Sequence, residues 1–232
     1  MVITLYHVSF EKGAPSVIIY GMLVIFSVIV LIFSAVIHEV MHGVVANHLG
    51  DPTARLMGRL TLNPLKHLDP FGSVILPLLL ALVPGGIIFG WAKPVPYNPY
   101  NLRNKRWGEA IVAVAGSATN ILLAIIFALV VRFGASFGFD ATALSLAALI
   151  AFINLFLGFF NLIPFPPLDG FTALRAALPW HLSSGMGRFE NRIRAMGTLS
   201  LILFLLIFSF IFVGPFFNFV SWIFGLLVGK GI

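Results

Sequence analysis

The sequence alternates between long apolar stretches and shorter polar loops. Four stretches contain no Asp, Glu, Lys or Arg and are long enough to cross a membrane; they cover residues 17–37, 110–131, 141–160 and 195–213. An α-helix needs about 20 apolar residues to span the hydrocarbon core. The pattern therefore predicts four transmembrane helices, and it lacks the ten-residue alternation that is typical of an outer-membrane barrel.

Two further apolar segments are less regular. Residues 70–92 contain no charged residue, but they contain Pro77, Pro84, Gly85 and Gly86. Such residues break helices and are tolerated in a membrane only where protein or water satisfies the backbone. Residues 215–229 are about one helical turn short of a full span. We expect an all-α polytopic membrane protein with about five to six transmembrane helices and a re-entrant hairpin at residues 70–92.

The composition excludes an ordinary soluble protein. Of the 232 residues, 59% are hydrophobic and 9% are charged, and the mean hydropathy is +1.04; a soluble domain has about 25% charged residues. The net charge of +6 is typical of cationic loops beside a membrane, so nucleic acid is not an expected partner. Because the chain has no cysteine, any metal must be held by His, Asp, Glu or water.

The cations indicate how the chain is oriented. Eleven of the fourteen Lys and Arg residues fall in three loops, at residues 48–69, 93–108 and 163–194. All three loops can be cytoplasmic only if residues 70–92 return to the side from which they entered. The N-terminus and the turn at residues 132–140 would then lie outside. No repeat or appended soluble domain is visible, so residues 1–232 are expected to form a single membrane domain.

The first apolar stretch runs into the motif His38-Glu39-Val40-Met41-His42. Two histidines four residues apart lie about 40° apart on a helix, one turn along it, so both can reach one ion. Glu39 lies beside them, where a carboxylate can act as a general base. Three ionisable groups within one turn of a transmembrane helix are costly and mark a functional site.

The other histidines lack a pairing pattern. His48 stands ten residues after His38, the spacing of metzincins, but those enzymes turn the chain at a glycine where this chain has Val45. In a continuous helix His48 lies about 240° around from His42 and faces away. His7, His67 and His181 are expected in interfaces or loops.

A second candidate segment follows the third predicted helix, from Asn161 to Gly170. Pro164, Pro166 and Pro167 cannot continue a helix, so they convert its end into extended backbone and present Asp169 from a fixed place. A turn without chemistry explains the Asp-Gly pair equally well.

At these residues the chain resembles the site-2 proteases, intramembrane zinc metalloproteases that cut membrane-anchored substrates within or near the bilayer. The resemblance covers most of the chain, and the short microbial branch without PDZ or CBS domains is the most similar. The motifs that carry it are His38-Glu39-x-x-His42, Gly50-Asp51, Leu62-Asn63-Pro64, Gly90-Trp-Ala-Lys-Pro-Val-Pro96 and Asn161-x-x-Pro164-x-Pro166-x-x-Asp169-Gly170.

The resemblance implies that His38, His42 and Asp169 bind one zinc ion per chain and that Glu39 is the catalytic acid and base. It also aligns a Gly-Pro-x-x-Asn element with residues 116–120, where Ser117 replaces the proline. Asn120 and Asn161 are then candidates for binding substrate or stabilising the transition state. A helix–helix hydrogen bond is the alternative for Asn120.

The function implied is zinc-dependent endopeptidase activity on membrane-anchored proteins, as in regulated intramembrane proteolysis. We expect a single-pass transmembrane substrate, residence in the cell (plasma) membrane and an active site toward the cytoplasm. Because a helix hides its carbonyl groups in its own hydrogen bonds, the substrate must unwind, and residues 70–96 are candidates to present an edge to it. Two alternatives remain: a metal-binding membrane transporter in which Glu39 is only a ligand, and a catalytically idle homologue that binds substrate helices.

Overall fold

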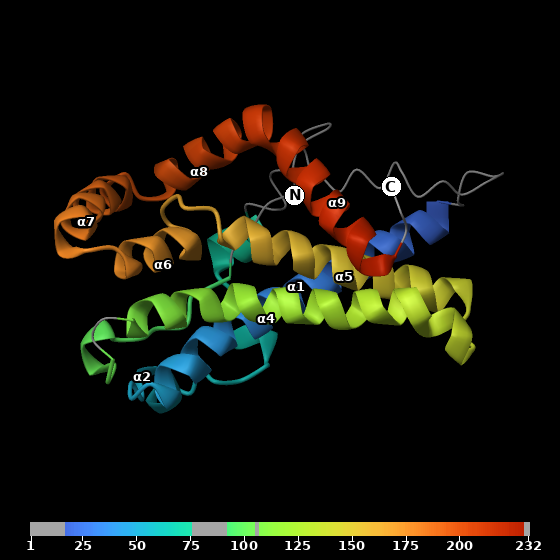
Figure 1. Cartoon of the computed structure of the whole chain (residues 1–232), viewed down its shortest axis with the longest axis horizontal. Coiled ribbons are helices and arrows are strands. Elements are labelled where there is room, and N and C mark those ends of the chain that lie inside the picture. The colour runs from blue at the N-terminus through green and yellow to red at the C-terminus, as the bar shows by residue number, and fades with distance from the viewer. Residues whose placement is uncertain (1–16, 76–91, 105–106, 230–232) are drawn as a thin grey trace.

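The computed structural model describes residues 17–75, 92–104 and 107–229, and within these it is helical (Figure 1). Four of its helical stretches are long and apolar enough to cross a membrane: Gly21–His48, Gly108–Phe137, Ala141–Asn161 and Ile202–Val228. The all-α membrane fold is therefore confirmed. The described part of the chain has four such stretches rather than five or six.

The elements follow one another along the chain as α-helices joined by short 3-10 and π-helical turns. They are α1 (Val17–His48), α2 (Thr53–Leu56), η2 (Pro64–Lys66), η3 (Pro70–Ile75), η4 (Pro99–Asn101), α4 (Gly108–Phe133), η5 (Gly134–Phe137), α5 (Ala141–Asn161), α6 (Asp169–Ala177), α7 (Trp180–Ala195), α8 (Thr198–Ile207), η6 (Phe208–Phe212) and α9 (Val213–Val228).

The count of spans differs because two predicted segments are one helical run. Residues 215–229, which are about one turn short of a span, follow residues 195–213 in one run: α8, η6 and α9 continue into each other and bend where they meet (Figure 1). Pro215 lies in the first turn of α9. Since proline has no N–H to donate to the preceding turn, it explains both the π-helical residues and the bend.

Helix α4 is the centre of the bundle and packs against α1, α5, α6 and α9. Its buried positions are mostly small residues: Gly108, Val112, Ala113, Ala115, Gly116, Ser117, Asn120, Ala124 and Ala128. Small residues let membrane helices approach closely. Close approach strengthens the van der Waals packing that drives their association, because no hydrophobic effect acts between helices in lipid. Ser117 replaces the proline of the resembled element, and α4 accordingly runs unbroken through it.

Helix α6 is tied to α4 and α7 by an ion-pair cluster. Arg175 of α6 pairs with Glu109 in the first turn of α4, and its Nε atom lies 3.0 Å from Glu190 Oε2 of α7 without being aligned for a hydrogen bond. Arg194 closes the cluster at 2.7 Å from Glu190 Oε1. The cluster fixes the short helix that begins at Asp169.

Asp51 connects the end of α1 to the loop before α4. Its carboxylate accepts hydrogen bonds from the backbone N–H and the hydroxyl of Thr53, from the backbone N–H of Asn98 and from the Asn101 amide, at 2.5 to 3.2 Å. Burial raises the pKa of Asp51, but these hydrogen bonds outweigh burial and lower it. Asp51 therefore acts as an ionised structural anchor.

The predicted re-entrant hairpin falls mainly on residues 76–91, which lie outside the described residues, so it stays a prediction. The two ends of the segment are nevertheless adjacent. Leu68 and Ala92 form an antiparallel bridge, and the Lys93 N–H donates to the His67 carbonyl at 2.7 Å. The residues that flank the predicted hairpin at 70–92 are thus adjacent.

Candidate metal centre

Helix α1 presents His38 and His42 one turn apart and buried against α4. The two imidazole rings lie with their centroids 4.7 Å apart and nearly perpendicular. Asp169, the first residue of α6, completes the group: its Oδ2 atom lies 2.9 Å from His38 Nε2 and 3.2 Å from His42 Nε2. The structure therefore brings together the three residues that the resemblance implies as ligands, from positions 131 residues apart in the chain.

The loop between α5 and α6 places Asp169 by folding back on itself. A Cβ atom at Gly170 would lie 2.1 Å from the Leu162 carbonyl oxygen, so only glycine allows the start of α6 to touch the end of α5. Burial raises the pKa of the Asp169 carboxyl, but hydrogen bonds to His38 and His42 outweigh it and lower the pKa to about 2. Asp169 is thus ionised at neutral pH, as a metal ligand must be.

The second nitrogen of each histidine is held by the protein. His42 Nδ1 lies 2.7 Å from the Val112 carbonyl oxygen, and His38 Nδ1 lies 2.7 Å from Asn120 Oδ1. A carbonyl oxygen can only accept, so His42 donates from Nδ1. Its Nε2 atom, which faces Asp169, is the nitrogen that would give up a proton to bind an ion. Partners of this kind orient metal-ligating histidines.

Gly116 makes room for the two imidazoles. A Cβ atom there would lie 2.6 Å from His42 Nε2 and 2.7 Å from two carbon atoms of His38. These distances are well inside ordinary van der Waals contact, so the rings fill the space that any larger residue would need. The sequence singled out Gly116 as part of a motif but gave no reason for it; the reason is this close approach.

The donor set fits zinc. Two imidazole nitrogens and a carboxylate oxygen are zinc ligands at about 2.0 to 2.2 Å, which places neighbouring tetrahedral ligands about 3.4 Å apart. The observed nitrogen-to-oxygen separations of 2.9 and 3.2 Å need only small outward movements to reach that value. In the described ranges, no other group of three His, Asp or Glu residues converges in this way.

Glu39 is half-buried beside the ligands and is held by backbone. Its Oε2 atom accepts a hydrogen bond from the Val95 N–H at 2.9 Å. The extended segment around Val95 is fixed in turn by the buried Arg59, whose Nη2 donates to the carbonyls of Lys93 and Pro94 at 2.9 and 3.3 Å. Sequence reasoning missed both contacts, because backbone groups leave no signature in residue type.

The two candidate asparagines differ in their surroundings. Asn120 is fully buried, and its amide nitrogen donates to Asn154 and to the Ser34 carbonyl. Asn161 is partly exposed at the end of α5 and donates to the Leu157 carbonyl. Asn120 thus lies behind His38 rather than on an open face, and a substrate-binding role for either residue stays a prediction.

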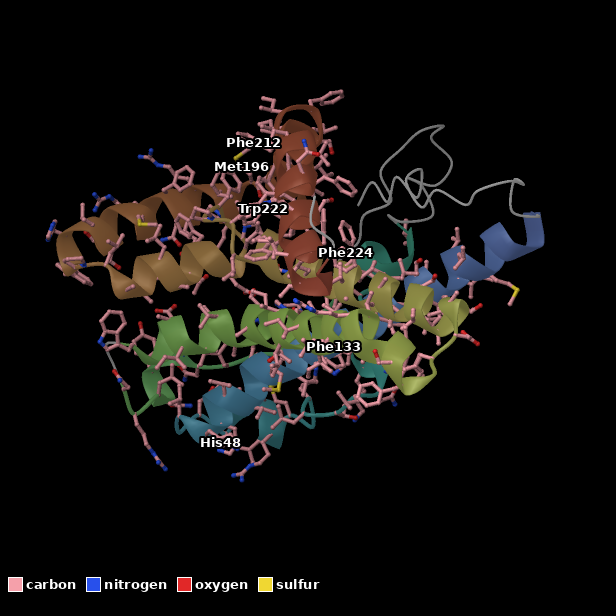
Figure 2. All side chains as sticks on the ribbon, turned by 45° about the vertical axis from the view of Figure 1, so that its right-hand side comes forward. His48, Phe133, Met196, Phe212, Trp222 and Phe224 are labelled. Carbon is pink, nitrogen blue, oxygen red and sulfur yellow. The ribbon has the colours of Figure 1, made fainter. Side chains whose placement is uncertain are left out.

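The remaining histidines lie elsewhere. His48 is exposed at the end of α1 (Figure 2) and His181 is exposed on α7. His67 is buried with its Nε2 atom 2.8 Å from the Thr61 carbonyl oxygen. His7 lies outside the described residues. For His48, His67 and His181, the structure agrees with the expectation that they are not ligands of this site.

Apolar spanning helices around a buried His-His-Asp set, with a glutamate beside it, are the arrangement expected of a membrane metalloprotease. The comparison with family models identifies which one: peptidase family M50 matches residues 26–140 and 135–207. The chain therefore belongs to this family, the site-2 proteases.

Curated relatives of the chain are also described as metalloproteases. The chain is 38% identical over 170 residues to "Putative zinc metalloprotease YwhC" of Bacillus subtilis, a match that covers 71% of this chain and 74% of the relative. It is 35% and 31% identical to "Putative zinc metalloprotease Rip2" of Mycolicibacterium smegmatis and Mycobacterium tuberculosis, covering 63% and 62% of this chain but 55% and 54% of those proteins. The match thus spans about half the length of the Rip2 proteins. No solved structure matches the chain. The names of these relatives describe zinc metalloproteases, and zinc is also the metal that the donor set of this chain fits.

Proposed function

We propose that this chain is a zinc-dependent intramembrane endopeptidase that hydrolyses peptide bonds of membrane-anchored proteins. The observation that supports this most directly is that Glu39 lies on the same turn of a spanning helix as His38 and His42. Asp169 of α6 lies beside the two histidines. The chemistry rests on one general base and three ligands from two helices.

His38, His42 and Asp169 would hold the zinc ion, which when bound would supply Lewis acidity for the scissile carbonyl and lower the pKa of water toward about 7. Glu39 takes the proton of the attacking water on its carboxylate and later donates that proton to the leaving amine. The Val95 N–H orients the carboxylate, so the base is held in place before substrate arrives.

The substrate must be an unwound segment, and residues 93–96 limit how it can pair. The Lys93 N–H already donates to His67, the Val95 N–H donates to Glu39, and Pro94 and Pro96 have no N–H. An extended substrate beside these four residues can therefore use only their carbonyl oxygens as partners, as at other proline-bearing strand edges. Full strand pairing would have to come from another segment, such as the predicted hairpin.

The site is proposed to face the cytoplasm of the cell (plasma) membrane. Among described cations only Arg132 lies at the end of the bundle away from the site, near the end of α9. Helices α2, α6 and α7 lie at the site end (Figure 1) and carry Arg55, Arg175, Arg188, Arg192 and Arg194. The other described cations contact the same end: Lys66 lies near Gly58, Arg103 near Gly50, and Arg59 bonds to the Lys93 carbonyl. This asymmetry is the one that the positive-inside rule describes.

The deciding experiment compares wild type with Glu39→Gln and Asp169→Ala in detergent, measuring bound zinc and cleavage of a single-pass model substrate. Glutamine is nearly isosteric but cannot act as a base, so Glu39→Gln should keep about one zinc per chain and lose cleavage. Asp169→Ala should lose zinc affinity and cleavage together.

Each alternative has its own outcome in this assay. Loss of zinc from Glu39→Gln would favour a transporter in which this residue is a ligand. A wild-type protein that binds zinc and substrate without cutting would be an idle homologue. We further expect cleavage to fall when Gly, Pro or Asn residues in the substrate helix are replaced by Leu, because the bond must be unwound first; equal cleavage of both substrates would contradict this.

A further inference from the structure

A chain of buried amides runs behind the first ligand. Asn120 of α4 faces His38 with its oxygen and donates from Nδ2 to Asn154 Oδ1 of α5 at 2.9 Å and to the Ser34 carbonyl oxygen of α1 at 3.3 Å. Asn154 donates from its own Nδ2 to the Ile150 carbonyl oxygen at 3.0 Å. Asn120 and Asn154 are 0% and 1% exposed, so no water competes for these groups.

The direction of this chain is fixed at its far end. The Ile150 carbonyl can only accept, so the nitrogen of Asn154 must face it and the oxygen of Asn154 must face Asn120. Asn120 then turns its nitrogen toward two acceptors, Asn154 and Ser34, and its oxygen toward His38. His38 must in consequence donate from Nδ1, so Nε2, which faces Asp169, is the nitrogen that must give up its proton to bind the ion.

We propose that Asn154 is a positioning residue for the metal: acting through Asn120, it sets the tautomer and orientation of His38. The Asn154 proposal rests on the proposed function, because it requires that His38, His42 and Asp169 bind zinc. The hydrogen bonds of Asn154 go to Asn120 and Ile150 and not to the three ligands. Asn154 contributes the acceptor oxygen that orders the Asn120 amide. Outer partners of this kind typically change metal affinity tenfold to a hundredfold.

Without that acceptor, Asn120 keeps only one partner for its nitrogen, the longer contact to Ser34. The amide can then turn over and present its nitrogen to His38 Nδ1, which stabilises the opposite tautomer with the proton on Nε2. That tautomer has no lone pair for the ion, so part of the population is unable to bind zinc until the amide turns back.

The test measures zinc affinity by chelator competition on purified full-length protein, with the absorption spectrum of the cobalt-substituted protein as a second readout of ligand geometry. Asn154→Leu removes the acceptor at similar size, whereas Asn154→Asp keeps an oxygen facing Asn120. Thr119→Val is the matched control, because the Thr119 hydroxyl is next to Asn120 on α4 but bonds only to the Ala115 carbonyl. His38→Ala reports whether the site itself binds metal.

We expect Asn154→Leu to weaken zinc binding about tenfold to a hundredfold and to alter the cobalt spectrum, with Asn154→Asp and Thr119→Val within a few-fold of wild type. Wild-type affinity in Asn154→Leu would overturn the proposal, and so would equal losses in the Leu and Asp variants, which would indicate packing alone. If His38→Ala kept its metal, the proposed function would fail instead. Thermal unfolding of the metal-free variants separates weak binding from misfolding. If the Leu variant does not fold, Asn154→Ala, which also removes the acceptor oxygen, takes its place and is judged by the same outcomes.

Discussion

Gly116 offers the sharpest test of the site's geometry, because a single methyl group should disturb two ligands at once. In Gly116→Ala the new carbon would stand 2.6 Å from His42 Nε2 and 2.7 Å from the nearest carbons of His38. Ordinary contact begins near 3.4 Å, so a ring must retreat by about 0.8 Å. Metal–ligand distances tolerate about 0.2 Å, and the displacement is roughly four times that.

The cost can be bounded. Forcing one extra methyl group into a packed interior costs about 1 to 3 kcal/mol. If that cost falls on the metal-bound arrangement of the rings, zinc affinity should fall by about fivefold to 150-fold, since each 1.4 kcal/mol is a factor of ten. Proteolysis at limiting zinc should fall in parallel, and excess zinc should restore part of it.

The assay is a chelator competition on purified protein, with Gly21→Ala as the control. Gly21 lies in the same type of spanning helix, and a Cβ atom there meets nothing within 4 Å, so the control carries the same substitution without the contact. A folded Gly116→Ala protein that binds zinc within twofold of wild type would refute the close approach of α4 to the ligand rings.

Three further predictions concern places outside the two histidines. Because the pKa of Asp51 is lowered in the fold, its stabilisation is complete above the unfolded pKa of about 3.9 and is lost as the pH falls through the lower folded value; the melting temperatures of wild type and Asp51→Asn should differ most at neutral pH and approach each other as the pH falls below about 3.9. Arg175→Gln removes the cation that bridges two carboxylates; it should lower the free energy of unfolding by about 1 to 3 kcal/mol, less than the 3 to 5 kcal/mol of a fully buried pair. The same variant should weaken zinc binding through Asp169, which thermal unfolding with and without zinc will report. Single cysteines at the exposed Tyr100 and Ser136 should react with an impermeant maleimide from opposite faces of the membrane, and labelling of both from one face would contradict the proposed orientation.

Local patterns in the sequence found two of the three candidate ligands. His38 and His42 follow from helical spacing, whereas Asp169 came from the family resemblance, because an Asp-Gly pair after prolines fits a turn without chemistry equally well. The apolar stretches predicted the spanning helices, since span length and charge are properties of a continuous segment. Features that depend on one continuous segment can therefore be predicted from that segment alone.

The parts that could not be predicted depend on contacts between distant segments or on backbone groups. The Val112 carbonyl and the Val95 N–H hold His42 and Glu39, yet any residue type offers such groups. The charge-free stretch ends at residue 37, whereas α1 continues to His48 and the chain turns at Gly50, whose φ of +111° favours glycine. The bend that joins α8 to α9 arises from Pro215 within an otherwise continuous apolar run, which composition alone divides into two.

The ligands come from two elements that are attached to the bundle in different ways, and this gives the metal a second role. His38 and His42 lie on a long helix packed along α4, whereas Asp169 begins a short helix secured by the Arg175 cluster and by the close contact at Gly170. An ion that binds all three cross-links α1 to α6. Since a ligand that binds only the folded state stabilises it by RT ln(1 + [L]/Kd), zinc should hold α6 in place as well as activate water. Removal of zinc should therefore loosen α6 before it disturbs α1, so that protection of α6 against proteolysis or hydrogen exchange follows zinc occupancy while that of α1 does not.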